Sequence, residues 1–94
     1  MRFEWDEKKD AGNRRKHKVS FVEAATVFRD ELAWEYPDPD HSVNEHRFLM
    51  LGMSHLLRVL VVAYCLRKEE SVIRIISARA ATRNEQRFYE RTGE

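Results

Sequence analysis

Three arginines and a tyrosine near the carboxyl end of the chain have residue types and a spacing suited to binding phosphate: Arg79, Arg83, Arg87 and Tyr89. A guanidinium group offers a planar fork of N–H donors that matches phosphate oxygens, and it stays charged at any working pH. Thr82 and Glu85 form a T-x-x-E capping box, which predicts the start of a helix beside these arginines. Because the amino terminus of a helix favours anions, this stretch is a candidate phosphate site.

Side chains from several parts of the chain, including this stretch, are suited to cleaving RNA without a metal ion. Such a reaction needs a base for the ribose 2′-hydroxyl, cations for the phosphorane and an acid for the departing 5′-oxygen. Six side chains are candidates for these catalytic roles: His17, Glu45, Arg47, Arg67, Arg79 and Tyr89. Three more are expected to contact RNA: Lys16, Lys18 and Arg83. Arg47 opens a predicted strand, while Arg67 and Arg79 close two others, so the three arginines can gather on one edge or face of a sheet.

Each candidate also has a structural interpretation. His17, at a helix end, can cap carbonyl groups, and Glu45 can form a surface pair with Arg47. Arg79 can form a salt bridge with Glu45 or Glu85, and Tyr89 can pack the last helix. Arg74 alternates with the apolar residues of a predicted strand. This position favours a role as a salt-bridge partner over a catalytic role.

The sequence shows no pattern typical of a metal or cofactor site. The four histidines include no pair four residues apart, and Cys65 has no C-x-x-C partner. A P-loop, a dinucleotide-binding glycine fingerprint and a G-x-S-x-G elbow are also absent. We therefore expect no cofactor. Cys65, within an apolar run, is expected to be a buried and inert thiol.

The length of 94 residues suits one domain with one core, which we place at residues 1–94. Apolar residues make up 43% and charged residues 35%, as in ordinary globular proteins. The net charge of +1 conceals a mosaic, because residues 8–18 hold six Lys or Arg and residues 30–45 hold six acids. No apolar run approaches the length of a membrane span, and no signal-like segment is present. We expect a cytoplasmic protein.

The order of the predicted elements indicates an α+β fold. Residues 2–6 form a short strand, residues 7–16 a polar helix capped by Asp6, and residues 20–28 an amphipathic helix opened by a Ser20–Glu23 capping box. Four strands follow at residues 32–36, 47–52, 58–67 and 72–77, and the third is the longest and is expected to be central. A last helix is predicted at residues 83–92, with Gly93 as its C′ residue. Short connections predict an antiparallel sheet packed by N-terminal helices and a C-terminal helix.

Several motifs along the chain are similar to those of one known family. The first part reads F-x-W-D-x-x-K from Phe3, N-x-x-K-H-x-V-S-F from Asn13 and E-A-x-x-V-F-x-D from Glu23. The second part reads E-x-R from Glu45, G-x-S from Gly52 and R-I-I-S-A-R-x-A-T-R-x-E from Arg74. In this order they resemble the BrnT family of toxins over nearly the whole chain. Two departures are Lys18, where the family usually has glycine, and Leu57-Arg58, which partly replaces a Gly-Arg pair.

The resemblance implies a RelE-like fold and a toxin of a type II toxin–antitoxin system. It implies metal-independent endonucleolytic cleavage of RNA that inhibits translation. It also implies a BrnA-like ribbon-helix-helix antitoxin, in a 2:2 heterotetramer that binds operator DNA through the antitoxin and represses its own operon.

Two other classes stay open from the residues alone. Basic patches also bind RNA without cutting it, although no RNP-type aromatic motif or helix-turn-helix is present. A charge mosaic can also serve a module that only binds another protein.

Overall fold

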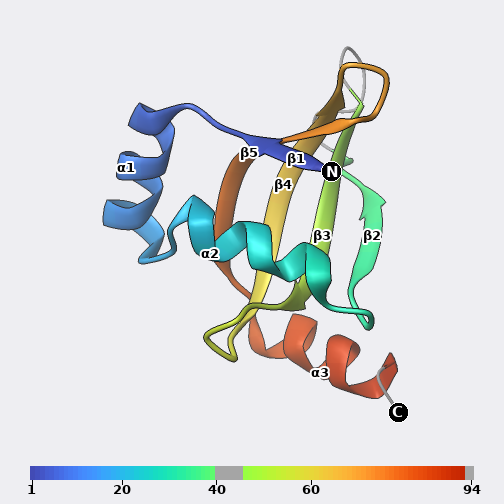
Figure 1. Ribbon diagram of the computed structural model, residues 1–94. Helices are drawn as coiled ribbons and strands as arrows, with labels where there is room; N and C mark the ends of the chain where they lie inside the picture. Colours follow the sequence, from blue (N-terminus) through green and yellow to red (C-terminus); the bar gives the residue numbers. More distant parts are fainter. Residues whose placement is uncertain (40–45, 93–94) are drawn as a thin grey trace.

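The computed structural model describes residues 1–39 and 46–92 (Figure 1). Its elements are β1 (Arg2–Glu4), α1 (Glu7–His17), α2 (Phe21–Thr26) with a 3-10 turn at Val27–Arg29, β2 (Trp34–Pro37), β3 (Arg47–Met53), β4 (Val59–Arg67), β5 (Val72–Ala80) and α3 (Arg83–Thr92). The predicted α+β fold is confirmed. Glu45 and Gly93, which the sequence placed in a site and at a helix end, lie outside the described residues.

The five strands form one sheet in the order β1-β5-β4-β3-β2, with β4 in the centre as expected. Strands β2 to β5 pair antiparallel, in keeping with their short connections. The prediction of an antiparallel sheet is wrong for β1, which pairs with β5 in parallel. No hairpin turn links β1 to β5, so turn geometry does not impose antiparallel pairing on it.

Strand β5 continues to Ala80, three residues beyond its predicted end, and its pairing with β4 contains an irregularity. Tyr64 lies opposite Ile75 and Ala63 opposite Ser77, which leaves Ile76 without a partner. Since side chains alternate between the faces of a strand, one extra residue moves every later side chain to the other face. Arg79 is therefore inside a strand, and its face is set by this bulge.

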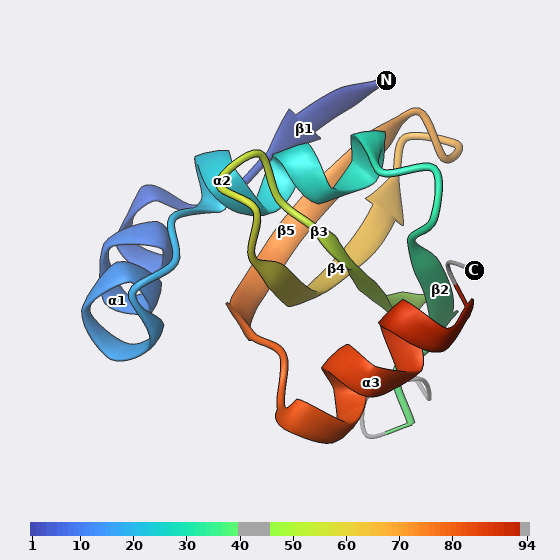
Figure 2. The same cartoon turned by 90° about the horizontal axis from the view of Figure 1, so that it is seen from below.

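The main core lies between the sheet and α2, which crosses one face (Figure 1). The predicted apolar stripe of α2 is confirmed, since Phe21 and Ala24 are fully buried and Phe28 packs against the cluster. Its partners come from the two strands β4 and β5: Leu60, Val62, Tyr64, Ile73, Ile75 and Ala78. A smaller cluster on the opposite side joins α3 to the sheet through Leu51, Val61, Ala81 and Tyr89. Figure 2 shows α2 and α3 on opposite sides of the sheet.

Local capping explains where the helices begin. The Asp6 carboxylate accepts the N–H groups of Lys8 and Lys9 and starts α1. Before α3 the capping box is complete, because Thr82 N–H donates to Glu85 at 2.8 Å and Glu85 N–H donates to Thr82 Oγ1 at 3.2 Å.

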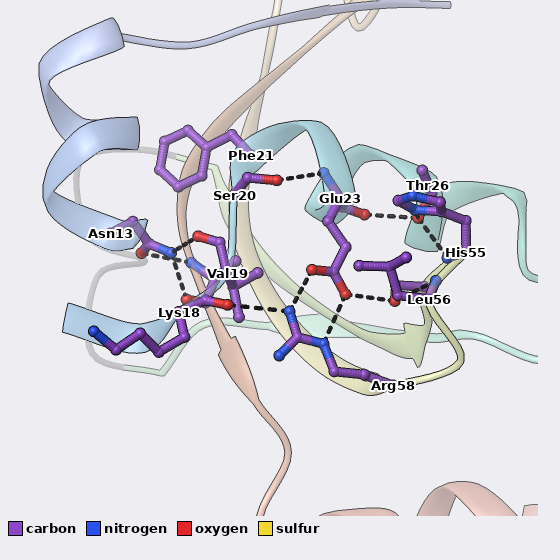
Figure 3. A network of polar contacts seen from close by, with 12 residues as sticks. Asn13, Lys18, Val19, Ser20, Phe21, Glu23, Thr26, His55, Leu56 and Arg58 are labelled. Atoms are coloured by element: carbon purple, nitrogen blue, oxygen red, sulfur yellow. Dashed lines mark hydrogen bonds and ion pairs between the residues drawn. The ribbon is translucent and has the colours of Figure 1, made fainter. Parts of the chain in front are cut away.

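The predicted capping box of α2 forms only in part. Ser20 Oγ accepts the N–H of Glu23 at 3.0 Å, but the Glu23 carboxylate binds Arg58 and the Ser54 hydroxyl instead of Ser20 (Figure 3). Burial alone raises the pKa of Glu23, and the bonds from Arg58 and Ser54 outweigh it, so the pKa lies below its ordinary value. This buried carboxylate ties the β3–β4 hairpin to α2.

The polar helix α1 packs beside the exposed edge of β5 (Figure 1). Its Asn13 side chain is buried and pairs with the backbone of Ala78, donating to the carbonyl at 2.8 Å and accepting the N–H at 3.1 Å. The amide thus replaces the backbone partner that an adjacent strand would supply. Among the described residues, no helix is long and apolar enough to cross a membrane.

Candidate functional site

The sheet face opposite α2 is only partly covered, because α3 packs against one end of it (Figure 2). Paired residues place three rows of side chains across this open face. The row beneath α3 consists of Trp34, Leu51, Val61 and Arg79. The middle row consists of Tyr36, Leu49, Ala63 and Ser77. The far row consists of Arg47, Cys65, Arg74 and Glu4.

The open face therefore carries the three arginines that the sequence proposed for one face: Arg47, Arg67 and Arg79. They do not gather at one end, because Arg47 lies in the far row, Arg67 lies just beyond that row, and Arg79 lies in the row beneath α3. At about 3.3 Å per residue, Arg74 and Arg79 are roughly 15 Å apart along β5. Small residues in the middle row, Ala63 and Ser77, separate the two basic ends.

At the far end of the open face, the carboxylate of Glu4 contacts two arginines. Arg74 donates to Glu4 Oε2 at 2.8 Å, and Arg67 Nε lies 3.6 Å from the same oxygen. The bond from Arg74 holds the pKa of Glu4 below its ordinary value. The salt-bridge interpretation of Arg74 is confirmed, and these exposed pairs fix side-chain direction more than they stabilise the fold.

At the other end, Arg79 is held by Glu85 in a two-point pair. Nη1 donates to Oε1 at 2.7 Å and Nη2 donates to Oε2 at 3.0 Å, while a further bond runs from Nη1 to the Ala80 carbonyl at 3.3 Å. This pair, opposed by burial and aided by the Thr82 N–H, lowers the pKa of Glu85 to about 2. Glu85 is thus fully ionised at neutral pH and too weak a base to take a proton from a hydroxyl group.

The geometry of this pair leaves a second fork on Arg79. A guanidinium has five N–H groups, and three of them are used by Glu85 and Ala80. The remaining Nε–H and one Nη2–H lie on the same edge of the group and bind none of the residues that the structure describes. The Arg79 side chain is 41% exposed. Arg79 is therefore fixed by one edge and can offer the other to an oxyanion.

Tyr89 lies on the inner side of α3 and is only 6% exposed. Its hydroxyl donates to the Asp30 carboxylate, which also accepts the Met53 N–H at 2.8 Å. Burial and the bond to Asp30 raise the pKa of Tyr89 to about 12. The packing interpretation of Tyr89 is confirmed, because the residue joins α3, the sheet and the end of the α2 segment.

The remaining candidates border the sheet at other places. Lys16 and His17 end α1 beside the β5 edge, and Arg83 is the exposed first residue of α3. Lys18 follows α1 with a left-handed backbone, φ 61°, and its carbonyl accepts a bond from Arg58 at 3.1 Å. A left-handed position favours glycine, and in this chain a lysine adopts it.

Sequence reasoning missed two parts of this surface. Ser77, expected to end a strand, is an exposed residue at the centre of the open face. Trp34 of β2 and Phe88 of α3 form an edge-to-face pair, although they are far apart in sequence. Only the register of the strands and the position of α3 reveal both. Cys65, expected to be buried, is half-buried in the far row. The described residues contain no group of three or more His, Cys, Asp or Glu side chains placed to hold a metal ion.

Comparisons with known proteins agree with this architecture. Residues 5–85 match the family described as "Ribonuclease toxin, BrnT, of type II toxin-antitoxin system". The fold is similar to the crystal structure of the Brucella abortus ribonuclease toxin BrnT, with a TM-score of 0.68 and 22% identity over 88% of this chain and 99% of that one. No curated protein matches the sequence. The chain belongs to the BrnT family of ribonuclease toxins of type II toxin–antitoxin systems.

Proposed function

We propose that this protein is an endoribonuclease that needs no metal ion and cleaves RNA on the open face of the sheet, which inhibits translation. The observation that carries the proposal is Arg79, pinned to Glu85 by one fork with a second fork exposed. Arg47 and Arg67 extend positive charge along the same face. RNA affinity depends mainly on such contacts with phosphates.

The proposed reaction uses the RNA's own 2′-hydroxyl. Its oxygen attacks the adjacent phosphorus as a base removes the proton, and the bond to the 5′-oxygen breaks as an acid supplies a proton to it. The products end in a 2′,3′-cyclic phosphate, or in a 3′-phosphate after hydrolysis, and in a 5′-hydroxyl. Negative charge builds on the phosphorane oxygens, where the Arg79 guanidinium is most effective.

His17, Glu45 and Tyr89 are the proposed sources of proton transfer. A phenol with a pKa of about 12 stays protonated at neutral pH, as an acid for the leaving oxygen must. Tyr89 would have to leave Asp30 to act in this way, whereas His17 ends α1 at the border of the sheet. Lys16, Lys18 and Arg83 are proposed to bind the flanking phosphates. Single substitutions of these residues, scored for cleavage rate and for melting temperature, distinguish them.

The decisive experiment is cleavage of end-labelled RNA by the purified protein in EDTA. We expect cleavage to persist, with upstream products whose 3′ ends become sensitive to a phosphatase only after the cyclic phosphate is opened. An Arg29→Ala variant is the matched control, because Arg29 is an exposed arginine of the 3-10 turn after α2, outside the proposed site. Activity that disappears in EDTA and returns with Mg²⁺, or products with 3′-hydroxyl ends, would refute the proposal.

The partner expected for a toxin of this family is an antitoxin. We propose a BrnA-like ribbon-helix-helix protein, whose paired strands would bring two toxins into a 2:2 complex that reaches operator DNA through the antitoxin and represses its operon. A downstream reading frame of that class, rescuing growth on co-expression, supports this partner. Light scattering well above the dissociation constant tests the stoichiometry, and a one-to-one heterodimer would exclude it.

A further inference from the structure

An apolar groove lies where α3 meets the open face near β2 and β3, next to Arg79. It has a volume of about 380 Å³ and is lined by Trp34, Tyr36, Leu51, Asn84, Glu85 and Phe88. Leu51 is buried, whereas Trp34 and Phe88 are 44% and 45% exposed. Their ring centroids are 5.5 Å apart with an interplanar angle of 64°. Large aromatic side chains this exposed, beside a hollow, are typical of binding surfaces.

Polar residues contribute a small part of the lining of this mainly apolar groove. Asn84 and Glu85, from the first turn of α3, line it together with the rings, and the exposed Asn84 amide has both donor and acceptor atoms. Of the Glu85 oxygens, Oε1 accepts bonds from Arg79 and Thr82, and Oε2 accepts one bond from Arg79. Because a carboxylate oxygen can accept two bonds, Oε2 retains one acceptor position.

Arg79 connects this groove with the proposed site of cleavage. Glu85 lines the groove and also holds the Arg79 guanidinium, so the guanidinium lies directly beside a residue of the groove lining. Tyr36 is close to the same two groups: burial and the Glu85 charge raise its pKa, and the Arg79 charge opposes them. A mainly apolar aromatic slot with a few hydrogen-bonding groups and a guanidinium beside its lining matches a nucleotide, in which a flat base is joined to an anionic phosphate.

We propose that the groove binds one unpaired base of the RNA substrate, stacked face to face on one of the Trp34 and Phe88 rings and packed edge-on against the other, while Arg79 holds a phosphate of the same nucleotide. This inference rests on the proposed function, since it assigns single-stranded RNA as the substrate. Every base has a π-face, and aromatic stacking is the usual way in which proteins hold unpaired bases. A purely apolar protein segment would leave the Asn84 amide and the second fork of Arg79 without partners.

The test measures affinity for a short single-stranded RNA with 2′-fluoro groups, which has no hydroxyl to attack phosphorus. Base stacking loses about 1–3 kcal/mol when the aromatic is replaced by alanine, so Trp34→Ala and Phe88→Ala should each weaken binding roughly 5- to 150-fold. Phe88→Tyr should bind like the parent protein. Leu56→Ala is the matched control, because Leu56 is exposed to a similar degree at the β3–β4 turn.

An oligonucleotide with abasic positions separates stacking from a structural effect of the substitutions. The parent protein should bind it more weakly than the intact oligonucleotide, whereas Phe88→Ala should bind the two nearly alike. Folding of each variant is checked by its melting temperature. If folded Trp34→Ala and Phe88→Ala proteins bind the intact oligonucleotide as well as the parent does, the inference is wrong, even when the parent cleaves RNA in EDTA.

The proposed function can also fail separately. If the parent protein cleaves no RNA, the proposed reaction falls, and the binding measurements still decide whether the groove holds a base. A third outcome is that the two substitutions abolish capture of the antitoxin and leave RNA affinity unchanged. The groove is then a protein-docking site, and the inference is overturned.

Discussion

Replacing Arg79 by alanine should reduce both stability and cleavage activity, and the contacts of Arg79 allow the size of each loss to be estimated. The pKa of Glu85 lies at about 2 instead of 4.5, a difference that corresponds to about 3 kcal/mol of favourable interaction in the ionised state. Because the Arg79 side chain is 41% exposed, solvent screening reduces this to about 1–2 kcal/mol. For a domain of this size, the melting temperature should fall by about 4–16 °C.

The effect on catalysis should be larger. Removing one donor that stabilises developing charge typically costs about 10²–10³ in rate. Arg79→Lys keeps the charge, but an ammonium group has no planar fork, so it cannot hold Glu85 by one edge and a phosphate by the other. We therefore expect Arg79→Ala and Arg79→Lys both to stay folded at 25 °C and both to lose most cleavage activity and toxicity.

Glu85→Gln provides the matched comparison. Glutamine still caps the Thr82 N–H, but it removes the ionised partner of Arg79. This variant should melt lower by a similar amount and keep cleavage within about tenfold of the parent, since the exposed fork of Arg79 survives. In the parent protein, the depressed pKa of Glu85 stabilises the fold above about pH 4.5, and this contribution disappears as the pH falls toward 2. The Glu85→Gln variant should lack this pH-dependent contribution to stability.

The assay is the initial rate of RNA cleavage in EDTA, expressed per folded molecule from circular-dichroism melting curves. If Arg79→Ala melts many degrees lower while its folded fraction cleaves at the parental rate, then Arg79 is a structural residue and the proposed site is wrong. Equal loss of activity in Glu85→Gln and Arg79→Ala would show that the pair acts as a unit, contrary to the separate roles of the two forks.

Three further predictions concern stability. Glu23→Ala should lower the free energy of unfolding by about 2–4 kcal/mol in urea titrations, because Glu23 is a buried carboxylate that joins two segments. Gly52→Ala should lower the free energy of unfolding by about 1–3 kcal/mol, since the added Cβ would lie 2.8 Å from Val27 Cγ1. Gly12→Ala should raise it by up to about 1 kcal/mol, because the nearest atom to its added Cβ is 3.9 Å away. Thermal melts compare the two variants. Tyr89→Phe should destabilise the protein below pH 10, and its deficit should vanish as the pH rises toward 12, because a raised phenol pKa stabilises only the protonated form; denaturation at several pH values measures this.

Local chemistry in the sequence was sufficient to predict most of the elements. Asp6 and Thr82 carry the hydrogen bonds that begin α1 and α3, and both bonds join residues at most three apart in the chain. The β-branched runs predicted β4 and β5, and the stripe of α2 predicted which helix packs on the sheet. Such signals survive in a sequence because their physical causes are short-range.

Two predictions failed where a distant group competes with a local one. Glu23 has the spacing of a capping box, but Arg58 and Ser54, more than 30 residues away, take its carboxylate. β1 was expected to join an antiparallel sheet, and it pairs with the free edge of β5 in parallel. In both cases the stronger or more available partner is brought close only by folding, and no local pattern records it.

The sequence by itself determined the family, the α+β class and the arginines that are suited to phosphate. Only the tertiary structure decided which way Arg79 points, because the bulge at Ile76 reverses the alternation of β5 and places Arg79 on the open face, away from α2. It also decided that Arg47 and Arg79 stand at opposite ends of that face, and that Trp34 and Phe88 meet beside Glu85. The physical reason is that register between strands and the docking of a helix depend on the whole packed sheet, whereas a period of two along one strand carries no record of an inserted residue.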